Sequence, residues 1–156
     1  MNIISEQIVT IFKIGKFPYA PGTIGSLFAF LTLSIFYQNI NYNIFFILFI
    51  ILLVISNFLV GIYIKDLINK DAKEIIIDEF IGCYLIYLFF PIFKNENQFL
   101  LIILSFFIFR FFDIIKLYPA NIIDKKMKNS FGIILDDIIA SIYSIIVLLF
   151  MYKYVL

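Results

Sequence analysis

The sequence predicts an all-α fold: a polytopic transmembrane helical bundle of about five spans, preceded by an N-terminal helix lying in the membrane interface. Hydrophobic residues make up 63% of the 156 positions and charged residues only 15%, whereas soluble proteins average about 25% charged residues. The hydrophobic residues also fall into long runs separated by short polar loops. We therefore expect a single integral-membrane domain over residues 1–156.

The first predicted element is the interfacial helix, over Ile3–Ile14. Ile4, Ile8, Ile11 and Phe12 recur on one side of such a helix, as in amphipathic helices that lie along a membrane surface. A helix that packs against the rest of the protein would show the same spacing, so both interpretations stay open.

Five hydrophobic runs follow, most of them near the ~20 residues that a hydrocarbon core of ~30 Å requires. The first run is short and has the length of a re-entrant arm, so the number of spans needs independent support. The runs are Ile24–Tyr37, Ile44–Ile64, Ile77–Phe93, Phe99–Ile115 and Ile134–Tyr152.

The distribution of lysines supports five crossings with an internal N-terminus. Nine lysines then fall on one side of the membrane and two on the other, in agreement with the positive-inside rule. A re-entrant first run would place the lysine-rich loops 65–74 and 116–132 outside. The nine are Lys13, Lys16, Lys65, Lys70, Lys73, Lys116, Lys125, Lys126 and Lys128, and the two are Lys94 and Lys153. We expect the loop Asn121–Ser130 to be mobile and solvated, serving as a topology signal, with direct contact to the substrate as the less favoured alternative.

With this topology, five carboxylates lie near the same, cytoplasmic, face. Against their five negative charges, Arg110 and Lys116 supply two positive charges, so the group must take up protons or bind cations. Oxygen ligands without histidine favour Mg²⁺, followed by Mn²⁺ and Ca²⁺. Acidic pairs at helix starts can also be simple caps and topology signals. The five predicted metal ligands are Asp78, Glu79, Asp113, Asp136 and Asp137.

The spacing of these residues predicts a shared site. Arg110, Asp113 and Lys116 recur every three residues, which places them on about one third of a helix circumference. Asp78 and Asp136 are each expected to begin a helix, where the positive end of the helix dipole favours anions.

The segment KFPYAPGTIGSL is predicted to bind the phosphate of a substrate. Thr23 is the expected N-cap of the first span, and Gly22 and Gly25 expose backbone N–H groups at its start. Pro18 and Pro21 are expected to hold the chain extended before this start. A Pro-Gly turn before a helix is common, so this segment gains weight from lying at the same face as the acids.

Absent residues exclude several activities. The chain has no histidine, which excludes histidine-nucleophile phosphatases. A cysteine phosphatase loop needs an arginine six residues after its cysteine, and here Phe89 occupies that position after Cys83.

With a single cysteine, no internal disulfide is possible. There is no basic stripe for nucleic acid and no sign of an obligate protein partner. Metal-assisted hydrolysis remains, with attack by water or by an aspartate.

Four blocks, APGTIGSL, IIIDEFIG, FRFFDIIKLYP and FGIILDD, resemble in this order the bacterial phosphatidylglycerophosphatase A family. The resemblance implies a Mg²⁺-dependent inner-membrane phosphatase that converts phosphatidylglycerophosphate to phosphatidylglycerol. Leu117 and Ser141 depart from the family pattern, which has proline and glycine there. By matching positions, the resemblance selects Pro21, Gly22, Thr23, Gly25, Ser26, Asp78, Glu79, Gly82, Arg110, Asp113, Lys116, Pro119, Asp124, Gly132, Asp136 and Asp137.

Within this set, the acids are expected to bind metal or activate water, with Asp113 either a metal ligand or the residue that orients Arg110. Arg110 and Lys116 are expected to clamp phosphate, through a planar fork and a point charge respectively. The alternative function is a small ion- or proton-coupled transporter, because intramembrane acids also mark ion pathways. A third hypothesis is an inert assembly subunit, which leaves the cluster of acids unexplained.

Overall fold

The computed structural model describes residues 3–65, 73–93 and 97–154, and every regular element among them is helical. This confirms the all-α prediction. The elements in chain order are α1 (Ile3–Val9), the 3₁₀ helix η1 (Ile14–Lys16), α2 (Pro21–Asn39), α3 (Tyr42–Lys65), α4 (Ile77–Leu88), the 3₁₀ helix η2 (Phe90–Phe93), α5 (Gln98–Ile115), α6 (Ala120–Lys126) and α7 (Ser130–Tyr154).

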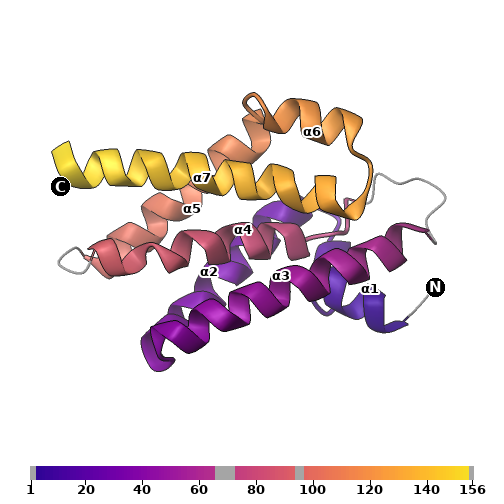
Figure 1. The fold of residues 1–156 in the computed structure, drawn as a ribbon, viewed down its shortest axis with the longest axis horizontal. Coiled ribbons are helices and arrows are strands. Elements are labelled where there is room, and N and C mark those ends of the chain that lie inside the picture. Colours follow the sequence, from indigo (N-terminus) through magenta and orange to yellow (C-terminus); the bar gives the residue numbers. More distant parts are fainter. Residues whose placement is uncertain (1–2, 66–72, 94–96, 155–156) are drawn as a thin grey trace.

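The long helices form an elongated bundle around α4 (Figure 1). Helix α4 contacts α2, α3, α5 and α7, and the short helix α6 packs against α7. The C-terminal end of α3 and the N-terminal ends of α4 and α7 lie at one end of the bundle, and the C-terminal end of α7 lies at the other. The elements that carry the predicted acids in α4 and α7 therefore start from the same end.

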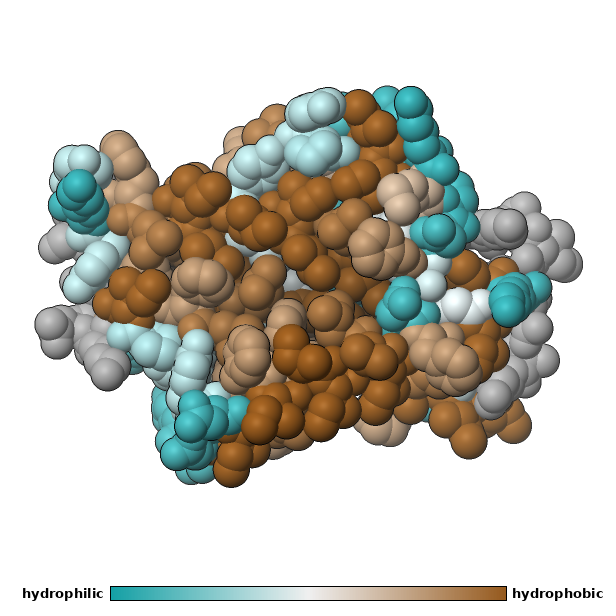
Figure 2. All heavy atoms as spheres, viewed as in Figure 1, coloured by the Kyte–Doolittle hydropathy of each residue, from teal (hydrophilic) through white to brown (hydrophobic). Residues whose placement is uncertain are grey.

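Three helices, α3, α5 and α7, are long and apolar enough to cross a membrane, as judged from the described residues. Figure 2 shows hydrophobic residues over the middle of the visible face and hydrophilic residues gathered toward its ends. These features fit a membrane protein, whereas the predicted count of about five spans is not confirmed. Helix α2 has 19 residues, but its Gly, Ser, Thr, Gln and Asn residues make it less apolar.

Helix α4 is shorter than the predicted span Ile77–Phe93. It has 12 residues, or ~18 Å, against a hydrocarbon core of ~30 Å. Pro91 explains the early end, because proline has no N–H to donate and disfavours helical backbone in the residue before it. The chain continues as the 3₁₀ helix η2, so the prediction was right about the start of α4 and wrong about its length.

The core of the bundle surrounds α4, on which Ile81, Cys83, Ile86 and Tyr87 have no exposed surface. The hydroxyl of Tyr87 donates to the carbonyl of Phe30 in α2 at 2.8 Å. In the same way, Tyr84 donates to Phe45 in α3 at 2.9 Å. These two bonds satisfy buried hydroxyls and fix α4 against both neighbouring helices.

The N-terminal segment differs from the predicted interfacial helix Ile3–Ile14. Helix α1 ends at Val9, because the next residues turn back with the left-handed φ angles of Ile11, Phe12 and Lys13. Ile11 is consequently buried while Phe12 is 78% exposed, so the predicted one-sided hydrophobic face does not form over its full length.

The prediction of a loop over Asn121–Ser130 is also partly wrong. Helix α6 occupies residues 120–126 and packs on α7. Lys125 and Lys126 lie in the last turn of α6, where cations interact favourably with the helix dipole. Two of the lysines used for the topology prediction, Lys70 and Lys94, lie outside the described residues.

Gly82 allows α4 to approach α5 and α7 closely. A Cβ atom there would lie 2.8 Å from Ser141 Oγ and 2.9 Å from the Phe109 ring. We expect Gly82→Ala to lower the free energy of unfolding by roughly 1–2 kcal/mol, because this overlap outweighs the ~1 kcal/mol gain in helix propensity. Thermal unfolding in detergent micelles would measure the change.

Gly61→Ala is the matched control, because it is also a helical glycine. The nearest atoms to an added Cβ would be Ser130 Oγ at 3.4 Å and Ser130 Cβ at 3.8 Å. This variant is expected to be as stable as the wild type or slightly more so. Equal unfolding temperatures for the two variants would contradict the close approach at Gly82.

Candidate active site

A cavity of about 450 Å³ opens where the starts of α2 and α4 meet the end of α5, helix α6 and the first half of α7. Its size is typical of small-ligand sites. Four cationic and four acidic side chains line it, in contrast to the hydrophobic surface of the bundle. They are Lys73, Arg110, Lys116 and Lys128, with Asp78, Glu79, Asp124 and Asp136.

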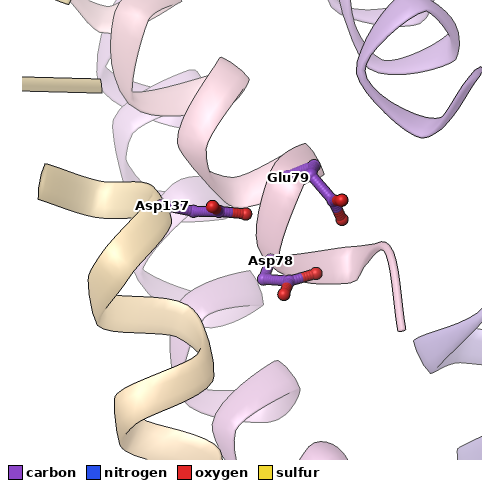
Figure 3. Close-up of side chains that lie close together, drawn as sticks. All are labelled: Asp78, Glu79 and Asp137. Atoms are coloured by element: carbon purple, nitrogen blue, oxygen red, sulfur yellow. The ribbon is translucent and has the colours of Figure 1, made fainter. Parts of the chain in front are cut away.

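Three carboxylates meet at this cavity, and we call them the carboxylate triad: Asp78, Glu79 and Asp137. One oxygen from each lies within 4.8 Å of the others. Asp78 and Glu79 belong to the first turn of α4, as predicted, and Asp137 projects from α7 toward them (Figure 3). Asp137 is only 3% exposed, so the triad extends from the cavity into the bundle.

The triad has the properties of a site for a hard divalent cation. Asp78 Oδ1 and Glu79 Oε2 are buried and have no hydrogen-bond partner within the described residues. Buried polar atoms are rarely left unpaired, and several carboxylates repel one another unless a cation lies between them. Oxygen donors at this spacing suit Mg²⁺, which commonly binds through one or two carboxylates together with substrate phosphate. The residues therefore fit the predicted metal.

Arg110 reaches the cavity from α5 and is held from two sides. It forms an ion pair with Asp113 one turn later, and its Nη1 also donates to Ser26 Oγ in α2 at 3.2 Å. The two side chains of the ion pair are nearly buried, so water screens it only weakly. Asp113 thus orients Arg110 and, unlike Asp78 and Glu79, has a cation as its partner.

The start of α2 borders Arg110 and the triad. A Cβ atom on Gly22 would overlap Glu79 Oε1 and lie 3.4 Å from both terminal nitrogens of Arg110, so any larger residue here would displace the Glu79 carboxylate. Thr23 is not the N-cap, because α2 already begins at Pro21 after Ala20. The prediction started the helix late because it followed hydrophobicity, whereas proline is favourable at the first helical position.

Lys116 ends α5 in a left-handed conformation, with φ 48°. Its Nζ donates to Asp124 Oδ1 at 2.7 Å and to Asp136 Oδ2 at 2.6 Å, which leaves one N–H donor for a ligand. Burial lowers the pKa of Lys116, but the hydrogen bonds to Asp124 and Asp136 raise it more, so its pKa lies above the ordinary value. Lys116 therefore stays protonated at neutral pH.

Asp136 does not begin a helix, which corrects the prediction. Helix α7 starts at Ser130, where the side chain of Asn129 accepts the N–H of Gly132 at 2.8 Å. The hydrophobic run begins later than the helix because its first turn contains small and polar residues. Asp136 therefore lies almost two turns inside α7, and Lys116, rather than the helix dipole, compensates its charge.

Of the predicted phosphate-binding residues, Pro21, Gly22 and Thr23 line the cavity with Arg110 and Lys116. Gly25 packs on Ile76, and Ser26 lies behind Arg110.

Two further lysines, Lys73 and Lys128, also line the cavity. From the sequence, Lys73 indicated only topology, and Lys128 lies in the loop for which substrate contact was the less favoured alternative. Their positions a few residues before the acids of α4 and α7 were the available signal for a role at the site.

Comparison with known proteins gives a consistent result. The family model described as phosphatidylglycerophosphatase A matches residues 7–152. Phosphatidylglycerophosphatase A of Haemophilus influenzae is 34% identical over 82% of this chain and 76% of that protein. The Escherichia coli protein of the same name is 32% identical over 89% of this chain and 78% of its own.

A further relative is named as a candidate phosphatidylinositol-3-phosphatase, from Bacteroides thetaiotaomicron. It is 30% identical over 90% of this chain and 89% of its own length. No solved structure matches the chain.

Proposed function

The chain belongs to the phosphatidylglycerophosphatase A family, and on this premise we propose that it removes the terminal phosphate of phosphatidylglycerophosphate. Membership makes it a phosphoric monoester hydrolase. The observation that carries the proposal is the carboxylate triad, two of whose members, Asp78 and Glu79, line a polar cavity together with Arg110 in an otherwise hydrophobic bundle. The products are phosphatidylglycerol and inorganic phosphate.

Asp78, Glu79 and Asp137 are the residues proposed to hold Mg²⁺. When bound, this ion supplies positive charge that stabilises the developing negative charge on the phosphoryl oxygens. Asp113 and Asp136 were also predicted as metal ligands, but each is engaged by a cationic side chain. We therefore assign them to positioning Arg110 and Lys116.

The side chains around the cavity account for binding of the phosphomonoester. Arg110 offers a planar pair of N–H donors to two phosphate oxygens, and its ion pair with Asp113 sets its orientation. The backbone N–H of Gly22, in the first turn of α2, adds a donor at a helix N-terminus. The remaining N–H of Lys116 can bind a third oxygen.

In the proposed reaction, a water molecule attacks phosphorus in line with the bond to the glycerol oxygen. Glu79 accepts a proton from the attacking water, because its carboxylate lines the cavity beside Arg110 and Gly22. The bond from phosphorus to the glycerol oxygen then breaks, and the released oxygen takes up a proton from solvent in the cavity. Glu79 afterwards returns its proton to the solvent. The hydrophobic bundle anchors the rest of the lipid near the cavity.

We further propose that the site lies at the cytoplasmic face of a bacterial inner membrane. The support is the predicted lysine distribution, together with the cavity's position among the starts of α4 and α7. Membership of an enzyme family favours hydrolysis over the alternative of ion- or proton-coupled transport.

The test is phosphate release by the purified protein in mixed micelles. Substrates would be phosphatidylglycerophosphate, phosphatidylinositol 3-phosphate, phosphatidate and a soluble sugar phosphate, each with Mg²⁺ and with EDTA. We expect the fastest release from phosphatidylglycerophosphate, loss of activity in EDTA and recovery with added Mg²⁺. Ion flux in liposomes without phosphate release would instead support the transporter.

A further inference from the structure

Glu74 is an acidic residue outside both the cavity lining and the carboxylate triad. It lies four residues before Asp78 and is half-buried. Tyr63, in the last turn of α3 and without exposed surface, donates its hydroxyl to Glu74 Oε1 at 2.5 Å. This bond joins α3 to residues 74–76, which we call the lead-in segment of α4. The reaction described above gives the bond no role.

Two further contacts reach the lead-in segment from the N-terminal part of the chain. The N–H of Ile76 donates to the carbonyl of Val9, the last residue of α1, at 3.1 Å. The carbonyl oxygen of Glu74 lies so close to Gly15 in η1 that a Cβ atom there would come within 2.0 Å of it. Helix α1 itself packs on α3 (Figure 1). The lead-in segment is therefore held by α1, η1 and α3 together.

The start of α4 depends on this support because it lacks a local cap. Its N-cap residue is Ile76, whose aliphatic side chain makes no capping hydrogen bond within the described residues. Asp78 and Glu79 follow in the first turn. Metal ligands need to be held to within about 0.5 Å of their working positions. A shift of the lead-in segment would move these two carboxylates away from Asp137, which belongs to α7.

We propose that Tyr63 and Glu74 are positioning residues for the metal site. Their hydrogen bond fixes the lead-in segment, and through it the first turn of α4, so that one oxygen of each triad member stays within 4.8 Å of the others. This inference rests on the proposed function. Neither residue contacts substrate or metal. A hydroxyl donating to a carboxylate suits the task, because such a bond is about twice as strong as one between neutral groups.

The test is the Tyr63→Phe variant, which removes one hydroxyl and keeps the ring. We expect the dissociation constant of Mn²⁺, measured by electron paramagnetic resonance in detergent micelles, to rise about tenfold, as when a residue that orients metal ligands is lost. The Mg²⁺ concentration for half-maximal phosphate release should rise in parallel. KM for phosphatidylglycerophosphate at saturating Mg²⁺ should stay within about twofold, because the contacts of Arg110 are unchanged.

Tyr87→Phe is the matched control. Tyr87 is equally buried and donates to the carbonyl of Phe30 at 2.8 Å, but it lies in the last turn of α4, away from the triad. Each variant loses one buried hydroxyl and its hydrogen bond, so both are expected to unfold at a lower temperature. Only Tyr63→Phe is expected to weaken Mn²⁺ binding.

Glu74 provides a second pair of variants, and its half-buried side chain can be replaced without opening the core. Glu74→Gln keeps an acceptor oxygen for Tyr63, so we expect its Mn²⁺ affinity to stay within about threefold of the wild type. Glu74→Ala has no acceptor and should weaken Mn²⁺ binding as much as Tyr63→Phe does.

Unchanged Mn²⁺ binding in Tyr63→Phe and Glu74→Ala would overturn the positioning role. Equal weakening in Tyr87→Phe would also overturn it, because the loss would then follow from lower stability alone. A wild type that binds no Mn²⁺ would refute the triad together with its positioning. A wild type that binds Mn²⁺ but releases no phosphate from phosphatidylglycerophosphate would refute the proposed function, while the Mn²⁺ measurements would still decide the role of Tyr63 and Glu74.

Discussion

Asp137→Asn is expected to lower phosphate release by at least about 10²- to 10³-fold without unfolding the protein. Asparagine has nearly the same shape, so the packing of α7 is kept, but one negative ligand of the carboxylate triad is lost. Asp78→Asn should have the same effect, because its oxygen faces the same point. Phosphate release at saturating Mg²⁺ measures the activity, and Mn²⁺ binding followed by electron paramagnetic resonance measures the metal affinity separately.

Asp124→Asn is the matched control for this experiment. It makes the same change of carboxylate to amide at the cavity, but Asp124 is a more exposed partner of Lys116 and does not belong to the triad. We expect less than about a tenfold loss of activity and unchanged Mn²⁺ binding. Triad variants that bind Mn²⁺ and release phosphate as well as the Asp124 variant does would refute the metal assignment.

Arg110→Lys is expected to reduce kcat/KM by about 10²-fold or more, although it conserves the positive charge. The guanidinium contacts Asp113 and Ser26 simultaneously while facing the cavity. A lysine ammonium is a point charge without the planar fork, so it cannot keep these contacts and bind two phosphate oxygens. Steady-state kinetics would measure the loss, and the inhibition constant of inorganic phosphate should rise in parallel.

Ser26→Ala provides the comparison, because it removes a supporting bond and leaves the guanidinium in place. The lost hydrogen bond, 3.2 Å long, is expected to lower kcat/KM by no more than about tenfold. Activity of Arg110→Lys equal to that of the wild type would show that charge alone matters at this position, and the proposed bidentate binding would then be wrong.

Helix positions were predictable because hydrophobic runs are a local signal. The second and fourth predicted runs match α3 and α5 to within two residues at each end. The predicted helix ends were wrong where the end of a hydrophobic run is not the end of the helix. Pro91 ends α4 before its hydrophobic run ends, and α7 begins at Ser130, before its hydrophobic run begins. The turn at Ile11 carries no sequence signal comparable to glycine, so its left-handed backbone was missed.

The candidate site was predicted as a set of residues, but not as a set of pairs. Charge counting required a cation near the five acids, and the carboxylate triad fits that requirement. Charge counting could not tell which acids already have a cationic partner. From the sequence alone, Arg110 can either pair with Asp113 or bind substrate, and Lys116 can reach several acids. Those choices depend on side-chain distances across helices.

The sequence by itself determined a hydrophobic helical protein, a cluster of acids without histidine, and the motifs that resemble one enzyme family. Tertiary structure alone decided that Asp137 joins Asp78 and Glu79 while Asp113 and Asp136 hold cations, and that Lys73 and Lys128 line the same cavity. The physical reason is that helix formation depends on neighbours a few residues apart. Metal coordination and charge pairing instead depend on separations of a few ångströms between residues that packing brings together from distant parts of the chain.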